Sequence, residues 1–402
     1  MDRIDKNVLN VGAFIKVILL VYLTDCSFVS INSSAIISVG SKIILLGWAI
    51  LLFVNNLILK RKKVHVGILF VTMSIFISAS FADAIFSFGY YQFVIAALWI
   101  AYFMADEFSL EDFSFYYCIL MRIIACVSIL GVFFSKIIVK LSFIPTFTSP
   151  VGIQYKFLFF TTVPFPEHIA ARNFGPFWEP GTYQVYLCIA LILVLFVEKN
   201  NKKVLDVSLL CIAGVMTLSG AILIPFIIIF ATYALCEKNS KALGLVLLVC
   251  VTLIVSKNLG LLDSILIKLS GQDSNSSLMF RWIGLEGGVR AFLHNPIFGC
   301  TPQINNDIKS ALAMKYLGNS YGSNANTFAN YFGYFGGFVG CYFMINSFRC
   351  WKSIFNNAIY GFLIMIAYLM CTSNENMTAS LLVCCIVYFR SCNKKVQNKA
   401  LN

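Results

Sequence analysis

The chain has 402 residues, of which 59% are hydrophobic and 12% are charged, and its mean hydropathy is +0.83. A soluble domain usually carries about twice that share of charged residues, so the composition excludes an ordinary soluble protein. The net charge of +12 does not require a nucleic acid partner. Lys and Arg gather in short connections between apolar segments, where they set membrane topology and meet anionic lipids.

Apolar segments of roughly 20 residues, the length that crosses a bilayer, recur along the whole chain. We predict about twelve transmembrane helices, near 11–31, 35–59, 64–82, 85–104, 114–134, 181–197, 204–219, 220–236, 242–262, 326–347, 354–372 and 376–390. The first segment has no small-residue cleavage site and is expected to be retained. The bias of Lys and Arg toward alternate connections places both termini in the cytoplasm. The sequence therefore predicts an all-α fold with one integral membrane domain over 1–402.

Two connections, 135–180 and 263–325, are much longer than the others. Loops of this length are usually functional or disordered, and these are too apolar for disorder. The first loop opens with an amphipathic stretch at 137–143, which we expect on the membrane surface or against the bundle. Alternation of the spans puts both loops on the same, outer side of the membrane, so they can build one site.

The first loop ends in a rigid motif at 172–181, with the sequence Arg-Asn-Phe-Gly-Pro-Phe-Trp-Glu-Pro-Gly. It places Arg172 and Glu179 directly before an apolar span. The second loop echoes it, because Arg290 precedes Gly299 by nine residues, as Arg172 precedes Gly181. The planar guanidinium fork of Arg matches phosphate oxygens, so arginines that converge at a membrane face suit a diphosphate. Glu179 offers a carboxylate that can accept a proton from a sugar hydroxyl or orient an arginine or acceptor sugar.

Structural interpretations compete with this chemistry. Arg172 can anchor the chain at lipid head groups, and Glu179 can cap the following helix. Arg281 and Arg290 lie nine residues apart, which puts them on different faces of one helix, and either can be solvated. The remaining candidates also have structural alternatives. His294 can close a turn, Asn324 and Asn326 can cap a helix, and Trp178 can belong to an interfacial aromatic belt.

Metal and disulfide chemistry find little support in the sequence. The 14 cysteines fall mostly within apolar segments, where Cys acts as a small apolar filler. The chain has three histidines and no paired Cys-x-x-Cys motif, so we expect neither a metal site nor a cofactor.

Three segments, in this order along the chain, resemble the O-antigen polymerases of the Wzy type, within the wider O-antigen polymerase and ligase group. They are 174–181 (Phe-Gly-Pro-Phe-Trp-Glu-Pro-Gly), 281–299, which ends in Asn-Pro-Ile-Phe-Gly, and 323–328 (Ser-Asn-Ala-Asn-Thr-Phe), followed by the Gly-rich aromatic segment 331–343. The layout of about twelve spans with two long outer loops is similar too.

The resemblance implies a GT-C-like membrane glycosyltransferase in the bacterial inner membrane that serves lipopolysaccharide biosynthesis. A glycan on undecaprenyl diphosphate would be passed to the next lipid-linked repeat unit at the periplasmic face, with inversion at the transferred sugar and no cofactor. The implied partners are undecaprenyl-diphosphate-linked oligosaccharides, membrane lipids and a chain-length regulator in the membrane, without nucleic acid.

The implied roles of individual residues follow from the same resemblance. The outer-loop arginines of the family, thought to engage the diphosphate, correspond to Arg172, Arg281 and Arg290. We expect Glu179, Arg172, Arg290 and His294 to be catalytic, and Arg281, Trp178, Asn324 and Asn326 to bind substrate. Some members place a Gly eleven residues after the Arg, and neither loop here keeps that spacing. Related ligases carry a His near the span that follows the second loop, where this chain has Asn324 and Asn326, so the identity of the base stays open.

Two other functions stay open at this point. An O-antigen ligase, which transfers glycan to the lipid A core, needs the same donor and a different acceptor. A transporter or flippase of lipid-linked glycans would concentrate ionisable groups along a central cavity, whereas the conspicuous groups here collect at one face.

Overall fold

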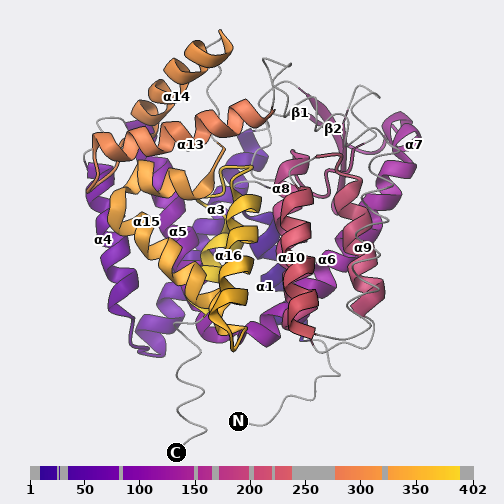
Figure 1. The fold of residues 1–402 in the computed structure, drawn as a ribbon, viewed down its shortest axis with the longest axis horizontal. Helices are drawn as coiled ribbons and strands as arrows, with labels where there is room; N and C mark the ends of the chain where they lie inside the picture. Colours follow the sequence, from indigo (N-terminus) through magenta and orange to yellow (C-terminus); the bar gives the residue numbers. More distant parts are fainter. Residues whose placement is uncertain are drawn as a thin grey trace, which may run out of the picture.

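The computed structural model describes residues 10–24, 27, 35–80, 85–148, 153–164, 172–198, 203–219, 222–237, 277–318 and 325–389. These residues are mostly helical. Figure 1 shows a bundle of helices with α13 and α14 lying across one end, where the small sheet and α7 also lie.

The helices alternate with short connections along most of the chain. In the first part they are α1 (Val11–Tyr22), α3 (Ala35–Phe53), the π-helical continuation η1 (Val54–Leu59), α4 (Val66–Ser80), α5 (Ile85–Glu107), α6 (Leu110–Phe133) and α7 (Ser135–Lys140). In the second part they are α8 (Pro180–Phe196), α9 (Lys203–Val215), α10 (Leu223–Glu237), α13 (Ser277–His294), α14 (Pro302–Leu317), α15 (Thr327–Ser353) and α16 (Ala358–Thr372). Residues 381–389 are helical as well.

Each predicted apolar segment except 242–262 overlaps one of these helices, and 242–262 lies outside the described residues. Within the described part of the chain, two helical stretches are long and apolar enough to cross a membrane, Val39–Leu59 and Leu110–Phe133. Other apolar helices have 10–17 residues. The helical class of the fold is confirmed, while the count of about twelve spans stays a prediction.

Helix α8 is the central element of the bundle. Its side chains are buried on every face from Pro180 to Leu195, and it packs against α6, α9 and α16. A helix that is apolar all round gains its stability from such complete burial. The turn that follows α16 lies against the first turn of α8, because a Cβ on Gly181 would collide with Glu375.

The first long loop contains a small sheet that the all-α expectation missed. Its antiparallel strands, in the order β1-β2-β3, are β1 (Thr146–Thr148), β2 (Gln154–Leu158) and β3 (Thr161–Pro164). Their Thr, Tyr, Phe and Val residues favour strands, but runs this short leave little periodicity to detect. The buried Lys156 of β2 donates hydrogen bonds from Nζ to the carbonyls of Leu141 (3.0 Å) and Ile144 (2.7 Å).

The amphipathic stretch expected at 137–143 is helical over Ser135–Lys140 as α7. Helix α7 contacts both α6 and β3. It therefore packs against the bundle, which is one of the two arrangements that its sequence predicted.

Candidate functional site

The motif at 172–179 is held firmly between the sheet and the bundle. Gly175 has φ +53, and a Cβ on it would lie 2.8 Å from the Tyr183 ring. Only glycine adopts this backbone conformation without strain. The carbonyl of Gly175 accepts hydrogen bonds from Thr162 of β3, through the backbone N (2.7 Å) and Oγ1 (3.0 Å). The backbone N of Asn173 donates to the carbonyl of Met216, just after α9 (2.8 Å).

The aromatic residues of this motif mainly build the core. Phe177 is fully buried, and its ring centroid lies 4.4 Å from that of Tyr186. Phe174 is buried against Tyr155, while Trp178 is half-buried beside them. The Trp178 carbonyl accepts a hydrogen bond from the Tyr155 hydroxyl (3.1 Å). Part of the Trp178 side chain is accessible, and its substrate-binding role stays a prediction.

Four charged residues meet at the end of the bundle where α8 begins: Arg172, Glu179, Arg281 and Glu375. Glu179 is the N-cap residue of α8, and its side chain makes no capping hydrogen bond. Glu375 lies in the turn that follows α16, and a hydrogen bond joins its side chain to that of Glu179. Both Arg172 and Arg281 interact electrostatically with Glu179, and Arg281 also acts on Glu375. We call these four residues the Arg–Glu cluster.

Each member of the cluster is positioned by a different element. Arg172 donates from Nε to the Thr217 carbonyl after α9 (3.1 Å), and Arg281 lies in the second turn of α13. The Glu375 carbonyl accepts a hydrogen bond from Thr327 Oγ1 at the start of α15 (2.8 Å). A Cβ on Gly181 would collide with Glu375 Oε1, so the carboxyl group of Glu375 lies directly on the first turn of α8.

The environment shifts the protonation of both carboxyl groups. Burial raises the pKa of Glu179, while its hydrogen bond to Glu375 and the two arginines oppose the rise. Burial has the largest effect on Glu375 and raises its pKa well above its usual range, and the negative charge of Glu179 raises the pKa further. The positive charge of Arg281 lowers it. Burial also lowers the pKa of Arg172 and Arg281, which the carboxylates oppose, and arginines stay charged at neutral pH. Such perturbed groups are concentrated at functional sites.

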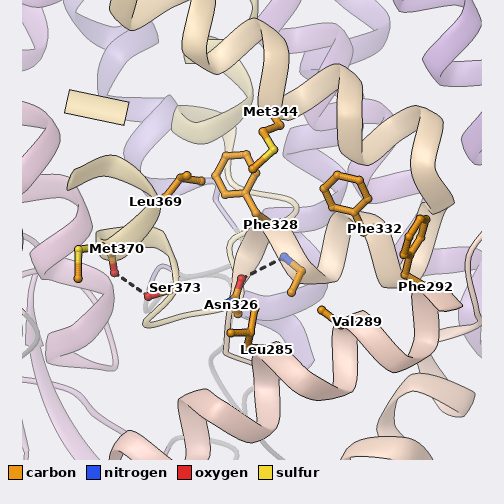
Figure 2. A pocket seen from close by; sticks show the side chains of 11 residues that line it. Leu285, Val289, Phe292, Asn326, Phe328, Phe332, Met344, Leu369, Met370 and Ser373 are labelled. Atoms are coloured by element: carbon orange, nitrogen blue, oxygen red, sulfur yellow. Dashed lines mark hydrogen bonds between the residues drawn. The ribbon is translucent and has the colours of Figure 1, made fainter. Parts of the chain in front are cut away.

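An apolar groove of about 370 Å³ lies between α13, α15 and α16. Figure 2 shows its lining, with Phe292 and Phe332 at one side and Leu285, Asn326 and Ser373 at the other. Leu285 lies one helical turn after Arg281, and Ser373 lies two residues before Glu375. Two residues of the groove lining are thus close in the chain to members of the Arg–Glu cluster, although the cluster residues themselves do not line the groove.

Arg290 lies away from this cluster. Its guanidinium forms an ion pair with Glu286 one turn earlier on α13 (Nη2 to Oε1, 2.7 Å), and its side chain is 53% exposed. Nine residues of an α-helix span about 13.5 Å and two and a half turns, so Arg281 and Arg290 point to opposite sides of α13. The nine-residue spacing of the two arginines had indicated different faces, and a catalytic role for Arg290 stays a prediction.

The other sequence candidates occupy the rim or lie outside the described residues. His294 is exposed in the last turn of α13, with Nδ1 3.7 Å from Cys300 Sγ. Asn326 caps α15, because its Oδ1 accepts a hydrogen bond from the Ala329 backbone N (3.0 Å), and it also lines the groove. Asn324 falls outside the described residues.

Sequence reasoning missed Glu375. One signal was present, because Glu375 is the one acidic residue in the polar turn Ser-Asn-Glu-Asn at 373–376, between two apolar segments. The same alternation of spans that groups the two long loops puts this turn on their side of the membrane. Nothing in the local pattern indicated which residue the carboxylate would meet.

Among the described residues, no group of three or more His, Cys, Asp or Glu side chains is arranged to hold a metal ion. Comparison with models of known protein families, with curated proteins and with solved structures finds no match.

Proposed function

We propose that this protein is a membrane glycosyltransferase that joins undecaprenyl-diphosphate-linked oligosaccharide repeat units, an O-antigen polymerase acting at the periplasmic face of the bacterial inner membrane. One observation carries the proposal: Arg172 and Glu179 from the first long loop meet Arg281 from the second loop at one end of the bundle. Cations beside a carboxyl group match a donor that carries a diphosphate leaving group and an acceptor that must lose a proton.

The surface of the bundle supports a membrane setting. Large apolar side chains point outward along α3 and α4, including Leu51 (69% exposed), Ile43 (63%) and Met73 (60%). Contiguous apolar surfaces of this kind indicate contact with a membrane or another protein. In the proposed topology of about twelve spans, the Arg–Glu cluster lies at the outer face.

The apolar groove supports a lipid-linked substrate. Its apolar lining, with partly exposed Leu285 and Val289, suits the first isoprene units of an undecaprenyl chain. Arg281 then lies one helical turn away, where the diphosphate of the same molecule would be. The order of Arg281 and the apolar groove along α13 thus matches the order of the diphosphate and the isoprene chain in the substrate.

In the proposed reaction, an acceptor sugar hydroxyl attacks the anomeric carbon of the donor from the face opposite the diphosphate. A new C–O glycosidic bond forms, the bond between the anomeric carbon and the phosphate oxygen breaks, and undecaprenyl diphosphate leaves. Arg172 and Arg281 stabilise the negative charge that develops on the leaving group. Glu179 accepts the hydroxyl proton, and burial raises its pKa toward the working pH, as a general base requires.

Arg290 and His294 lie further along α13 and remain candidates for the acceptor side of this reaction. A ligase would use the same donor site with a lipid A core acceptor. The choice between polymerase and ligase therefore depends on the acceptor rather than on the Arg–Glu cluster.

The polysaccharide profile of a deletion strain, resolved by gel electrophoresis, tests the proposal. A lipid A core that carries a single repeat unit identifies a polymerase. A core without any repeat, together with accumulated lipid-linked polymer, identifies a ligase instead. An unchanged ladder contradicts both and favours transport or another envelope glycan.

Complementation with variants then tests the site. We expect Arg172→Ala and Arg281→Ala to shorten or abolish the polymer at normal protein levels. Arg349→Ala is the matched control, since Arg349 is exposed near the far end of α15. Full-length polymer from both cluster variants would remove these arginines from the mechanism.

A further inference from the structure

The Arg–Glu cluster brings two carboxyl groups into direct contact, although its proposed chemistry uses only one. The carboxyl group of Glu375 lies against the first turn of α8, where a Cβ on Gly181 would collide with its Oε1, and Glu179 is the N-cap residue of that same turn with no capping hydrogen bond of its own. The two side chains are hydrogen-bond partners there. Two ionised carboxylates offer only acceptor oxygens, so a hydrogen bond between them requires a proton on one. The backbone around Glu375 is tied to α15 through Thr327, whose Oγ1 donates to the Glu375 carbonyl (2.8 Å) and accepts from the Met377 backbone N (2.9 Å).

We propose that Glu179 and Glu375 share one proton, held mainly on Glu375, so that the cluster presents one net positive charge to its ligand. Two arginines contribute two positive charges and the Glu179 carboxylate contributes one negative charge. If Glu375 were ionised as well, the cluster would be neutral. Glu375 is thus a positioning residue that keeps Glu179 ionised and oriented while preserving the attraction for an anionic ligand.

The surroundings place the proton on Glu375 rather than on Glu179. Glu179 faces both Arg172 and Arg281, whereas Arg281 is the cation that acts on Glu375. Glu179 also lies at the N-terminus of α8, where the helix dipole favours a negative charge. Burial raises the pKa of Glu375 well above its ordinary value, and the adjacent Glu179 carboxylate raises it further. On α15, the contact to Glu375 comes from the uncharged Thr327.

The location of this proton has a consequence for the diphosphate ligand of the proposed function, on which this part of the inference rests. At neutral pH the protonated Glu375 leaves the arginines free to attract the diphosphate. As the pH rises through the pKa of Glu375, the second carboxylate appears and cancels the remaining positive charge. We expect at least a tenfold loss of affinity for undecaprenyl diphosphate, because one charge interaction near a protein surface ranges from about tenfold to about a thousandfold as the distance between the charges shortens.

Infrared difference spectroscopy of the whole protein in nanodiscs detects the proton directly. The spectrum of the wild type minus that of Glu375→Gln at neutral pH should contain the C=O stretch of a protonated carboxylic acid. A difference spectrum with only carboxylate bands overturns the proposal. The control is Glu237→Gln, because Glu237 is exposed at the end of α10 and its replacement should remove carboxylate bands alone.

A second variant keeps the test independent of the folding of Glu375→Gln. Glu179→Gln removes the neighbouring negative charge, so the carboxylic acid band of Glu375 should titrate away at lower pH than in the wild type. A band that titrates at the same pH in both proteins contradicts the shared proton.

Binding of undecaprenyl diphosphate in the same nanodiscs separates this inference from the proposed function. As the pH is raised above neutrality, wild-type affinity should fall, whereas Glu375→Gln, which mimics the protonated acid, should keep its affinity. An equal fall in both proteins overturns the electrostatic role of Glu375. A carboxylic acid band in a protein that binds no undecaprenyl diphosphate upholds the shared proton and rejects the proposed function.

Discussion

Replacement of Arg281 by alanine gives the sharpest test of the Arg–Glu cluster. Arg281 interacts with both Glu179 and Glu375, and in the proposed reaction it also holds the diphosphate. A hydrogen bond to a charged group contributes about 1.5–3 kcal/mol. Loss of one such bond in the transition state lowers kcat/KM by about 10- to 150-fold. We therefore expect Arg281→Ala to fall in this range.

The same substitution should change the pH dependence of the reaction. Arg281 lowers the pKa of Glu179, against the larger effect of burial. Its removal raises that pKa, so the carboxylate form of Glu179 is lost at a higher pH. The acid limb of the kcat/KM profile should consequently move to higher pH. Arg281→Lys keeps the charge but not the planar fork, so it should restore the acid limb more fully than the rate.

The assay measures polymer formation from purified lipid-linked oligosaccharide by the protein in nanodiscs, across a pH series. Arg349→Ala serves as the control, and thermal unfolding in detergent confirms that each variant is folded. If folded Arg281→Ala keeps both its kcat/KM within twofold and its acid limb in place, Arg281 neither holds the diphosphate nor tunes Glu179, and the reasoning fails.

Three further predictions concern stability, measured by thermal unfolding in detergent. Gly175→Ala should destabilise the protein by about 1–3 kcal/mol, because it adds a steric clash to a left-handed backbone conformation. The control is Gly318→Ala, which should cost less because Gly318 has φ +69 but open space around it. Equal losses of stability in the two variants would count against the clash. Arg122→Met should cost about 1–3 kcal/mol, because it leaves the half-buried carboxylates of Glu198 and Asp206 without their cation. A neutral result would show that this ion-pair network is dispensable. Burial lowers the pKa of Lys309 to about 7, below the value of about 10.4 in the unfolded chain. Between these two pH values the unfolded chain binds more protons than the folded protein, so the free energy of unfolding of the wild type should rise with pH. Lys309→Met should lack that rise.

Local sequence patterns anticipated much of the architecture. Long apolar segments predicted helices, and apart from 242–262, which lies outside the described residues, each overlaps one. The motif at 172–181 predicted that Glu179 would stand at the start of a helix, and Glu179 is the N-cap residue of α8. These predictions succeeded because helix length and helix start depend on residues close together in the chain.

Predictions of short strands and of contacts between residues far apart in the chain were less successful. The strands β1 to β3 were missed because each is only three to five residues long. The resemblance assigned Arg290 to the diphosphate together with Arg172 and Arg281, whereas Arg290 pairs with Glu286 on the opposite side of α13, as the nine-residue spacing had indicated. The motif at 174–181 did not indicate which of its aromatic residues would be buried, and the structure places the ring of Phe177 fully buried against Tyr186.

The sequence by itself determined the helical class, the two long loops and the presence of Arg172, Glu179 and Arg281 within them. It also contains Gly175, which adopts a positive φ, and Gly181, where a Cβ would collide with Glu375. Only the tertiary structure decided that Glu375 joins Glu179. That contact depends on the packing of α16 against α8, which brings a turn near the end of the chain onto the first turn of a central helix. Periodicity records which face of a helix is apolar, but it does not record which helix covers that face, so the fourth member of the cluster became visible only in the folded protein.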